Sequence, residues 1–181
     1  MLRVIAGEAK GLRLQTPEGD VRPTSDRARE ALFSILHMRL EGARFADLYA
    51  GSGANGIEAL SRGAAHCAFV DSDSRANNVI GKNLFHTKLG HKSASYQLTL
   101  PASLGVLAAK EAAFDIVFCD PPYIGTDYTA LLSELVANKL VVPGGVVILE
   151  HESKLELPQS VGGLEKQREA RYGRVGMTFF A

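Results

Sequence analysis

The chain has 181 residues, 46% hydrophobic and 22% charged, which is the composition of a globular protein with a full core and excludes a low-complexity chain. Its 20 basic residues equal its 20 acidic ones, so overall charge gives no reason to expect nucleic-acid binding. No apolar run reaches the roughly 18 residues of a membrane span, and no secretory signal is recognisable. We therefore expect a cytoplasmic protein with no membrane partner.

The cysteines and histidines predict no metal centre. Cys67 and Cys119 are the only cysteines, and both fall in apolar segments, so we expect inert buried thiols. The five histidines are scattered and form no pair at the spacing of a metal site.

The chain begins with two short strand-like runs, residues 2–6 and 11–15, which predict a β-hairpin. A loop rich in Pro, Gly and Asp follows, and apolar residues then recur at helical spacing from residue 24 to about 40. Thr24 or Ser25 can cap this helix. We expect a single domain, in which residues 1–20 form the N-terminal hairpin and loop and residues 21–181 form the core.

Strands and helices alternate after residue 44. We expect strands at 45–49, 66–71, 93–98, 114–119 and 145–150, helices at 54–62, 74–87, about 99–110 and 127–139, and a final hairpin of 164–172 with 174–180. This alternation predicts an α/β fold of the Rossmann-like, doubly wound type. The expected sheet is mostly parallel and seven-stranded, with the N-terminal β-hairpin as an extension.

A glycine-rich loop joins the first core strand to the next helix. Its sequence, GSGANG over residues 51–56, matches G-x-G-x-x-G, and Asp71 follows Gly51 by 20 residues. A nicotinamide dinucleotide and S-adenosylmethionine both fit, with Asp71 on a ribose hydroxyl. Asp47 favours S-adenosylmethionine, because a carboxylate there would repel a pyrophosphate but attract an ammonium and a sulfonium. The alternative to a cofactor-binding loop is a glycine turn that only allows the strand and the helix to pack closely.

A second motif follows the apolar strand expected at 114–119. It consists of Asp120, Pro121, Pro122 and Tyr123, and we call it the acceptor motif. Ligands of open α/β sheets bind at the carboxyl ends of strands, where this motif lies. Asp120 and the Pro121 carbonyl can accept the two N–H bonds of a planar amine, while Tyr123 stacks on its ring. The prolines stiffen the loop, so the motif predicts chemistry on a planar amine rather than a loop that merely ends a strand.

Together these motifs resemble the class I amino-methyltransferases. The segment RPTSDRARE at residues 22–30 narrows the resemblance to the RsmD family. Two further segments, LSRGA at 60–64 and Tyr172-Gly173, also resemble that family. The resemblance implies methylation of the N2 amine of one guanine in 16S ribosomal RNA, position 966 in the usual numbering, in an assembling small ribosomal subunit. It implies S-adenosylmethionine as cofactor, and we expect a monomer.

The expected site residues form three groups. Asp47, Tyr49, Ala50, Gly51, Gly53 and Asp71 are expected to bind the cofactor; Asp120, Pro121, Pro122 and Tyr123 are catalytic; Arg3, Lys10, Arg13, Arg22, Thr24 and Arg27 bind RNA. Local ion pairs, such as Arg27 with Glu30, are the alternative for the arginines. No acid follows the third core strand. Contacts from residues 97–103 to the adenine of the cofactor must therefore come from backbone or hydroxyl groups.

Two further expectations concern burial. Glu150 is expected to be solvated. Four apolar residues of the first helix region are expected to pack in the core: Phe33, Ile35, Leu36 and Met38.

The residues leave other functions open. The acceptor could be another planar amine, adenine N6 in DNA or RNA or a protein glutamine, because Asp and Asn can both begin the acceptor motif. A non-catalytic, cofactor-binding ribosome assembly factor is a second alternative, against which the intact motif argues. A small-molecule oxidoreductase is the third.

Overall fold

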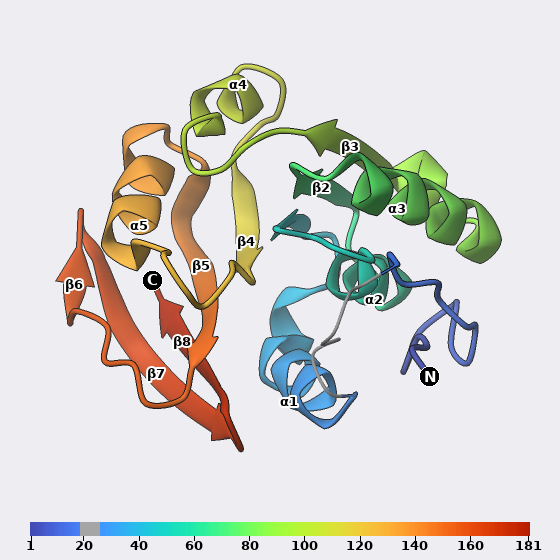
Figure 1. Cartoon of the computed structure of the whole chain (residues 1–181), viewed down its shortest axis with the longest axis horizontal. Coiled ribbons are helices and arrows are strands. Elements are labelled where there is room, and N and C mark those ends of the chain that lie inside the picture. Colours follow the sequence, from blue (N-terminus) through green and yellow to red (C-terminus); the bar gives the residue numbers. More distant parts are fainter. Residues whose placement is uncertain (19–25) are drawn as a thin grey trace. The chain divides into compact units, whose positions relative to one another are not determined.

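The computed structural model describes residues 1–18 and 26–181 (Figure 1). The chain forms two compact units, residues 1–98 and 99–181. The expectation of a single methyltransferase domain stays a prediction.

The first unit contains a parallel sheet in which β2 lies between β1 and β3. Its elements are α1 (Asp26–Leu36), η1 (His37–Arg39), β1 (Arg44–Leu48), α2 (Ala54–Ser61), β2 (His66–Asp71), α3 (Ser74–Thr87), η2 (Gly90–Lys92) and β3 (Ser93–Gln97). Helix α2 packs on β1 and β2, and α3 packs on β2 and β3. Both β1 and β2 are buried along most of their length, as parallel strands covered by helices must be.

The second unit contains five strands in the order β4-β5-β8-β7-β6. Its elements are α4 (Leu104–Ala108), β4 (Phe114–Cys119), α5 (Tyr128–Ala137), β5 (Val141–Glu152), β6 (Ser160–Val161), β7 (Leu164–Tyr172) and β8 (Val175–Phe180). Strands β4 and β5 are parallel, whereas β8, β7 and β6 continue the sheet in antiparallel fashion. The acceptor motif follows β4 directly, so this unit positions it.

The Rossmann-like α/β class is confirmed, with two corrections to the strands. The described residues form eight strands rather than seven, because the two-residue β6 is too short to leave a periodic pattern. Strand β5 begins at Val141 rather than at 145, since Gly144, with φ of 78°, passes through an irregular pairing with β4 instead of ending the strand.

The N-terminal reversal and the apolar helix face also differ in part from expectation. Residues 2–14 form a hairpin-like reversal with a single antiparallel bridge, Arg3 to Arg13. The Val4 N–H donates to the Leu12 carbonyl at 3.0 Å, and the Val4 carbonyl accepts from the Gly11 N–H at 2.9 Å. Both cysteines are buried and unbridged, as predicted. Met38 is 89% exposed, so its core assignment was wrong: it lies in η1, after the amphipathic pattern of α1 has ended.

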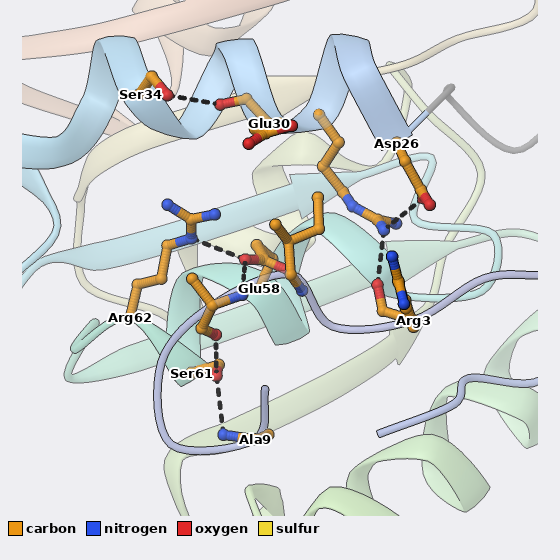
Figure 2. Close-up of polar contacts among 11 residues, drawn as sticks. Arg3, Ala9, Asp26, Glu30, Ser34, Glu58, Ser61 and Arg62 are labelled. Carbon is orange, nitrogen blue, oxygen red and sulfur yellow. Dashed lines mark hydrogen bonds and ion pairs between the residues drawn. The ribbon is translucent and has the colours of Figure 1, made fainter. Parts of the chain in front are cut away.

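A buried carboxylate on α2 holds the N-terminal segment (Figure 2). Glu58 is fully buried and accepts hydrogen bonds from the backbone N–H groups of Ile5, at 2.8 Å, and Ala6, at 3.0 Å. Arg62, one turn later, donates to the same carboxylate at 2.7 Å. Two backbone amides and one cation thus satisfy a charge that would otherwise be costly to bury.

Ser61, labelled in Figure 2, and Arg29 add to this attachment. The Ser61 hydroxyl donates to the Ala6 carbonyl at 2.6 Å and accepts from the Ala9 N–H at 2.9 Å. Arg29 of α1 donates to the Arg3 carbonyl at 2.6 Å and pairs with Asp26 at 2.9 Å. The N-terminal segment is therefore held by side chains of α1 and α2 and not by a β-ladder of its own.

We expect Glu58→Ala to lower the free energy of unfolding by about 3–5 kcal/mol, because two buried N–H groups and Arg62 lose their acceptor. Glu58→Gln keeps one oxygen that can accept these hydrogen bonds, so it should lower the free energy of unfolding by less. Urea unfolding measures the difference, and amide exchange at Ile5 and Ala6 shows whether the segment detaches first. An alanine variant as stable and as protected as the parent would contradict this role.

Candidate functional site

The glycine loop turns sharply between β1 and α2. Its backbone enters the left-handed region at Tyr49, Gly51 and Gly53, with φ of 61°, 55° and 75°. That region strains any residue with a Cβ, so the conformation imposed on Tyr49 is held by its surroundings. The Gly53 N–H donates to the Ala50 carbonyl at 2.7 Å, which closes the turn. A Cβ at Gly53 would lie 3.1 Å from Ile80, so the loop packs closely against α3.

Asp71, at the end of β2, fixes this loop. One carboxylate oxygen accepts from the Gly51 N–H at 2.9 Å, and the other accepts from the Asp73 N–H at 2.9 Å. Each oxygen of an ionised carboxylate has a second lone pair. Asp71 is half-buried, so those lone pairs can still accept from hydroxyl groups of a ligand.

Asp47 braces the other side of the loop from a buried position. Its side chain accepts from the Gly56 N–H, in the first turn of α2, at 2.8 Å, and the residue is only 1% exposed. Burial raises the pKa of Asp47 to about 8; the Gly56 hydrogen bond opposes this rise and the negative charge of Asp71 adds to it. The carboxyl group is therefore largely protonated at neutral pH, and a nearby cation would favour its ionised form.

Two asparagines of this region were missed by the sequence analysis. The buried Asn83 amide donates to the Ser52 carbonyl at 2.9 Å and exchanges two hydrogen bonds with the backbone of Gln15. Asn55, in the first turn of α2, is 9% exposed, and among the described residues its Oδ1 has no hydrogen-bond partner. Asn83 falls on the apolar face of α3 with Ile80 and Leu84, and a polar residue at such a position was the available signal.

The acceptor motif lies in the second unit, after β4. Pro121 is buried, and Asp120 and Tyr123 are half-buried. The Pro122 carbonyl accepts from the Thr126 hydroxyl at 2.6 Å, which ties the loop to itself. Within residues 99–181, no hydrogen-bond donor reaches the Pro121 carbonyl, so this oxygen can accept from a ligand.

Glu150 anchors the motif's aromatic ring. The Tyr123 hydroxyl donates to Glu150 at 3.1 Å, and Glu150 is 3% exposed. The expectation of a solvated Glu150 was wrong, because β5 continues to Glu152 and pairs there with β8. Burial, followed by the charges of Glu150 and Asp120, raises the pKa of Tyr123, so its phenol stays a neutral donor. The hydrogen bond holds the ring by its hydroxyl edge.

The neighbouring His151 has a structural role. It is buried, its Nδ1 lies 2.8 Å from the Glu152 carbonyl, and its Nε2 lies 2.7 Å from the Thr178 hydroxyl. A carbonyl can only accept, so Nδ1 carries the proton and Nε2 accepts from Thr178. Burial lowers the pKa of His151, which keeps the ring neutral.

The predicted RNA-binding residues are only partly described. Arg22 and Thr24 lie outside the described residues. Arg3, Lys10, Arg13 and Arg27 are all exposed, as contacts to a large ligand require. The local acid Asp26 pairs with Arg29, at 2.9 Å.

The structure also bears on membrane-spanning helices and on metal sites. Each helix within residues 1–18 and 26–181 is too short or too polar to span a bilayer. In the same residues, no group of three or more Cys, His, Asp and Glu side chains lies close enough together to hold a metal ion.

A family model described as "Conserved hypothetical protein 95" matches residues 2–181. The chain belongs to this family, the RsmD family. It is 37% identical over 180 residues to "Putative rRNA methyltransferase YlbH" of Bacillus subtilis, covering 99% of this chain and 98% of that one. It is 31% identical over 180 residues to ribosomal RNA small subunit methyltransferase D of Escherichia coli K12, covering 99% and 89%.

A solved structure of a hypothetical protein from Thermus thermophilus matches the RsmD-family fold of this chain. It has a TM-score of 0.84 and 34% identity, and the match covers 99% of this chain and 98% of that one. The match extends over both compact units. Together with the family model, it confirms the family resemblance that was inferred from the sequence motifs.

Proposed function

We propose that the chain transfers a methyl group from S-adenosylmethionine to the exocyclic N2 of a guanine in 16S ribosomal RNA, at the position that the family resemblance implies. We further propose that it acts as a monomer, in the cytoplasm, on an assembling small subunit. The observation that carries the proposal is the acceptor motif, in which an acid, an unsatisfied carbonyl and an anchored aromatic ring follow one strand.

The glycine loop supports binding of the methyl donor. S-adenosylmethionine supplies a methyl group on a positively charged sulfonium. The spare lone pairs of Asp71 suit ribose hydroxyls, and the unpartnered Oδ1 of Asn55 suits an N–H donor such as an ammonium. Asp47 offers a buried carboxyl group whose ionised form a nearby cation stabilises. Tyr49, Ala50, Gly51 and Gly53 bring the backbone of the loop to the ligand.

The acceptor motif supports chemistry on a planar amine. A nucleobase amine is a weak nucleophile because its lone pair is delocalised into the ring. Asp120 and the Pro121 carbonyl can each accept one N–H bond, which orients the nitrogen and meets the positive charge that grows on it. Tyr123 stacks on the base, which must leave its helical stack to reach the motif. Pro122 limits the freedom of the loop, and the amine proton leaves to solvent after the transfer.

The choice of guanine in small-subunit RNA rests on the family. The acceptor groups alone would also hold adenine N6 or a glutamine amide, since both present two N–H bonds to two acceptors. The relative from Escherichia coli K12 is named as a ribosomal RNA small subunit methyltransferase and is similar along nearly all of this chain. That similarity favours an RNA acceptor.

Methyl transfer from labelled S-adenosylmethionine to small-subunit particles tests the proposal. We expect one methyl group per particle, at guanine N2 by mass spectrometry of digested RNA. Label on adenine or on protein would contradict the acceptor. Donor binding by calorimetry without any transfer would favour the non-catalytic assembly factor, and absence of donor binding would favour the oxidoreductase.

A further inference from the structure

One segment beside the cofactor region carries basic residues and no acid. Residues 74–98 contain no Asp or Glu, and they carry Arg75, Lys82, Lys88 and Lys92 together with two histidines. Arg75 is paired with Asp73 at 2.7 Å, and Lys92 is paired with Glu8 at 2.9 Å. Among the described residues, no acid pairs with Lys82 or Lys88, so the two lysines leave a local positive charge on α3 and just after it.

An aromatic ring lies between these lysines. Phe85 is 88% exposed, whereas a helix of a globular protein normally turns its large apolar residues inward. Lys82 and Phe85 are three residues apart on α3 and share one face, and Lys88 follows the end of the helix. The ring and both cations line an open groove of 830 Å³, together with Asn78, His86 and Gln15.

The N-terminal segment borders this groove. The backbone of Gln15 is joined to Asn83 of α3 by hydrogen bonds of 2.8 and 3.0 Å, and Glu8 is joined to Lys92. The exposed residues Lys10 and Arg13 belong to that segment. The basic residues of the N-terminal segment and of α3 therefore lie on adjoining parts of the same unit.

We propose that the α3 face, defined as Lys82, Phe85, His86 and Lys88, binds a single-stranded segment of the substrate RNA. One base stacks on Phe85, and the phosphates on either side of it lie against Lys82 and Lys88. The inference deepens the proposed function and rests on it for the identity of the RNA.

RNA fits this face better than a protein does. A protein partner would bury a broad apolar area, but here a single ring stands among cations and amides. Single-stranded RNA needs just such a combination of one stacking platform with positive charges that follow its backbone.

The face lies away from the chemistry. Phe85 is 11 residues along α3 from Ser74, which is about 16 Å at the rise of an α-helix. Asp71 precedes the helix, and the glycine loop contacts the buried face of α3 at Ile80 and Asn83. Phe85 is exposed on the other side of the helix, so the α3 face grips RNA apart from the donor. It should therefore govern RNA affinity and KM, and it should leave donor binding and kcat unchanged.

The test compares face variants with matched controls. Phe85→Ala is expected to weaken binding to small-subunit RNA roughly tenfold and to raise KM for that RNA by a similar factor, through loss of stacking. The double variant Lys82→Gln/Lys88→Gln should also flatten the salt dependence, reducing the slope of log K against log salt by about 1.4. Met38→Ala and Lys110→Gln/Lys154→Gln remove an equally exposed apolar group and two exposed lysines elsewhere, and should behave as the parent.

The possible outcomes separate this inference from the proposed reaction. Face variants that bind RNA like the parent while methyl transfer is intact would overturn the inference alone. A parent that methylates no RNA, but whose RNA binding depends on Phe85 and the lysines, would overturn the reaction and leave the inference standing. Loss of a protein contact or of self-association in place of RNA binding would assign the face to a protein and contradict the proposal.

Discussion

Asp120→Ala is expected to reduce the rate of methyl transfer by about 10²–10³-fold, the loss typical of removing one group that stabilises charge in a transition state. Asp120 begins the loop after β4 and is half-buried beside Tyr123. Without its carboxylate, one N–H bond of the amine has no acceptor, and the positive charge that grows on nitrogen is met by the Pro121 carbonyl alone. Donor affinity should not change, because the substitution leaves Asp47, Asp71 and the glycine loop intact.

The control variants separate charge from geometry. Asp120→Asn keeps an oxygen acceptor without the charge and should retain more activity than the alanine variant. Thr126→Ala cuts the hydrogen bond that closes the same loop at Pro122 and should lower activity less. Single-turnover rates with saturating donor and RNA measure the chemical step, and calorimetry measures donor affinity. If Asp120→Ala methylates guanine as fast as the parent, the assigned role of Asp120 is wrong.

Both motifs could be recognised in the sequence because their residues are contiguous. The bounds of β2, α3 and β4 agree with the segments expected from periodicity, since strong apolar patterns end there at Asp71, Thr87 and Cys119. Asp47 and Asp71 lie at the carboxyl ends of β1 and β2, and in the other unit Asp120 follows β4. Ligands of α/β sheets bind at these strand ends, so the sequence was enough to mark each acid as a candidate.

Partners far apart in the chain could not be predicted in this way. Glu58 meets Ile5 across 53 positions, and Asn83 meets Gln15 across 68, so no local pattern records either contact. Glu150 was misjudged for the same reason: its burial depends on pairing with β8, and its partner Tyr123 lies 27 residues away. In each case a polar residue is buried because a distant segment satisfies it.

Donor affinity is expected to rise by up to about tenfold per pH unit between pH 6 and 7.5, because Asp47 must lose a proton when a cation binds beside it. Burial raises the pKa of Asp47 to about 8, so the carboxyl is mainly protonated over this range. A bound ammonium or sulfonium favours the carboxylate and lowers that pKa. The range ends at 7.5 because the donor's own α-amino group begins to lose its proton near roughly 7.7–8.0.

Asp47→Asn should abolish this pH dependence, since an amide has no proton to release, while its oxygen can still accept from Gly56. Calorimetry in two buffers of different ionisation enthalpy measures the proton released on binding. The apparent binding enthalpy should depend on the buffer for the parent and not for the variant.

The stability of the fold should change with pH in the opposite sense to donor affinity. Asp47 holds its proton to about pH 8 in the folded chain but ionises near 3.8 when unfolded, so its contribution to stability is complete below that value and is lost as pH rises to 8. Asp47→Asn should therefore be more stable than the parent at pH 8 yet bind the donor more weakly, and a variant that bound it as tightly would exclude a charge role for Asp47.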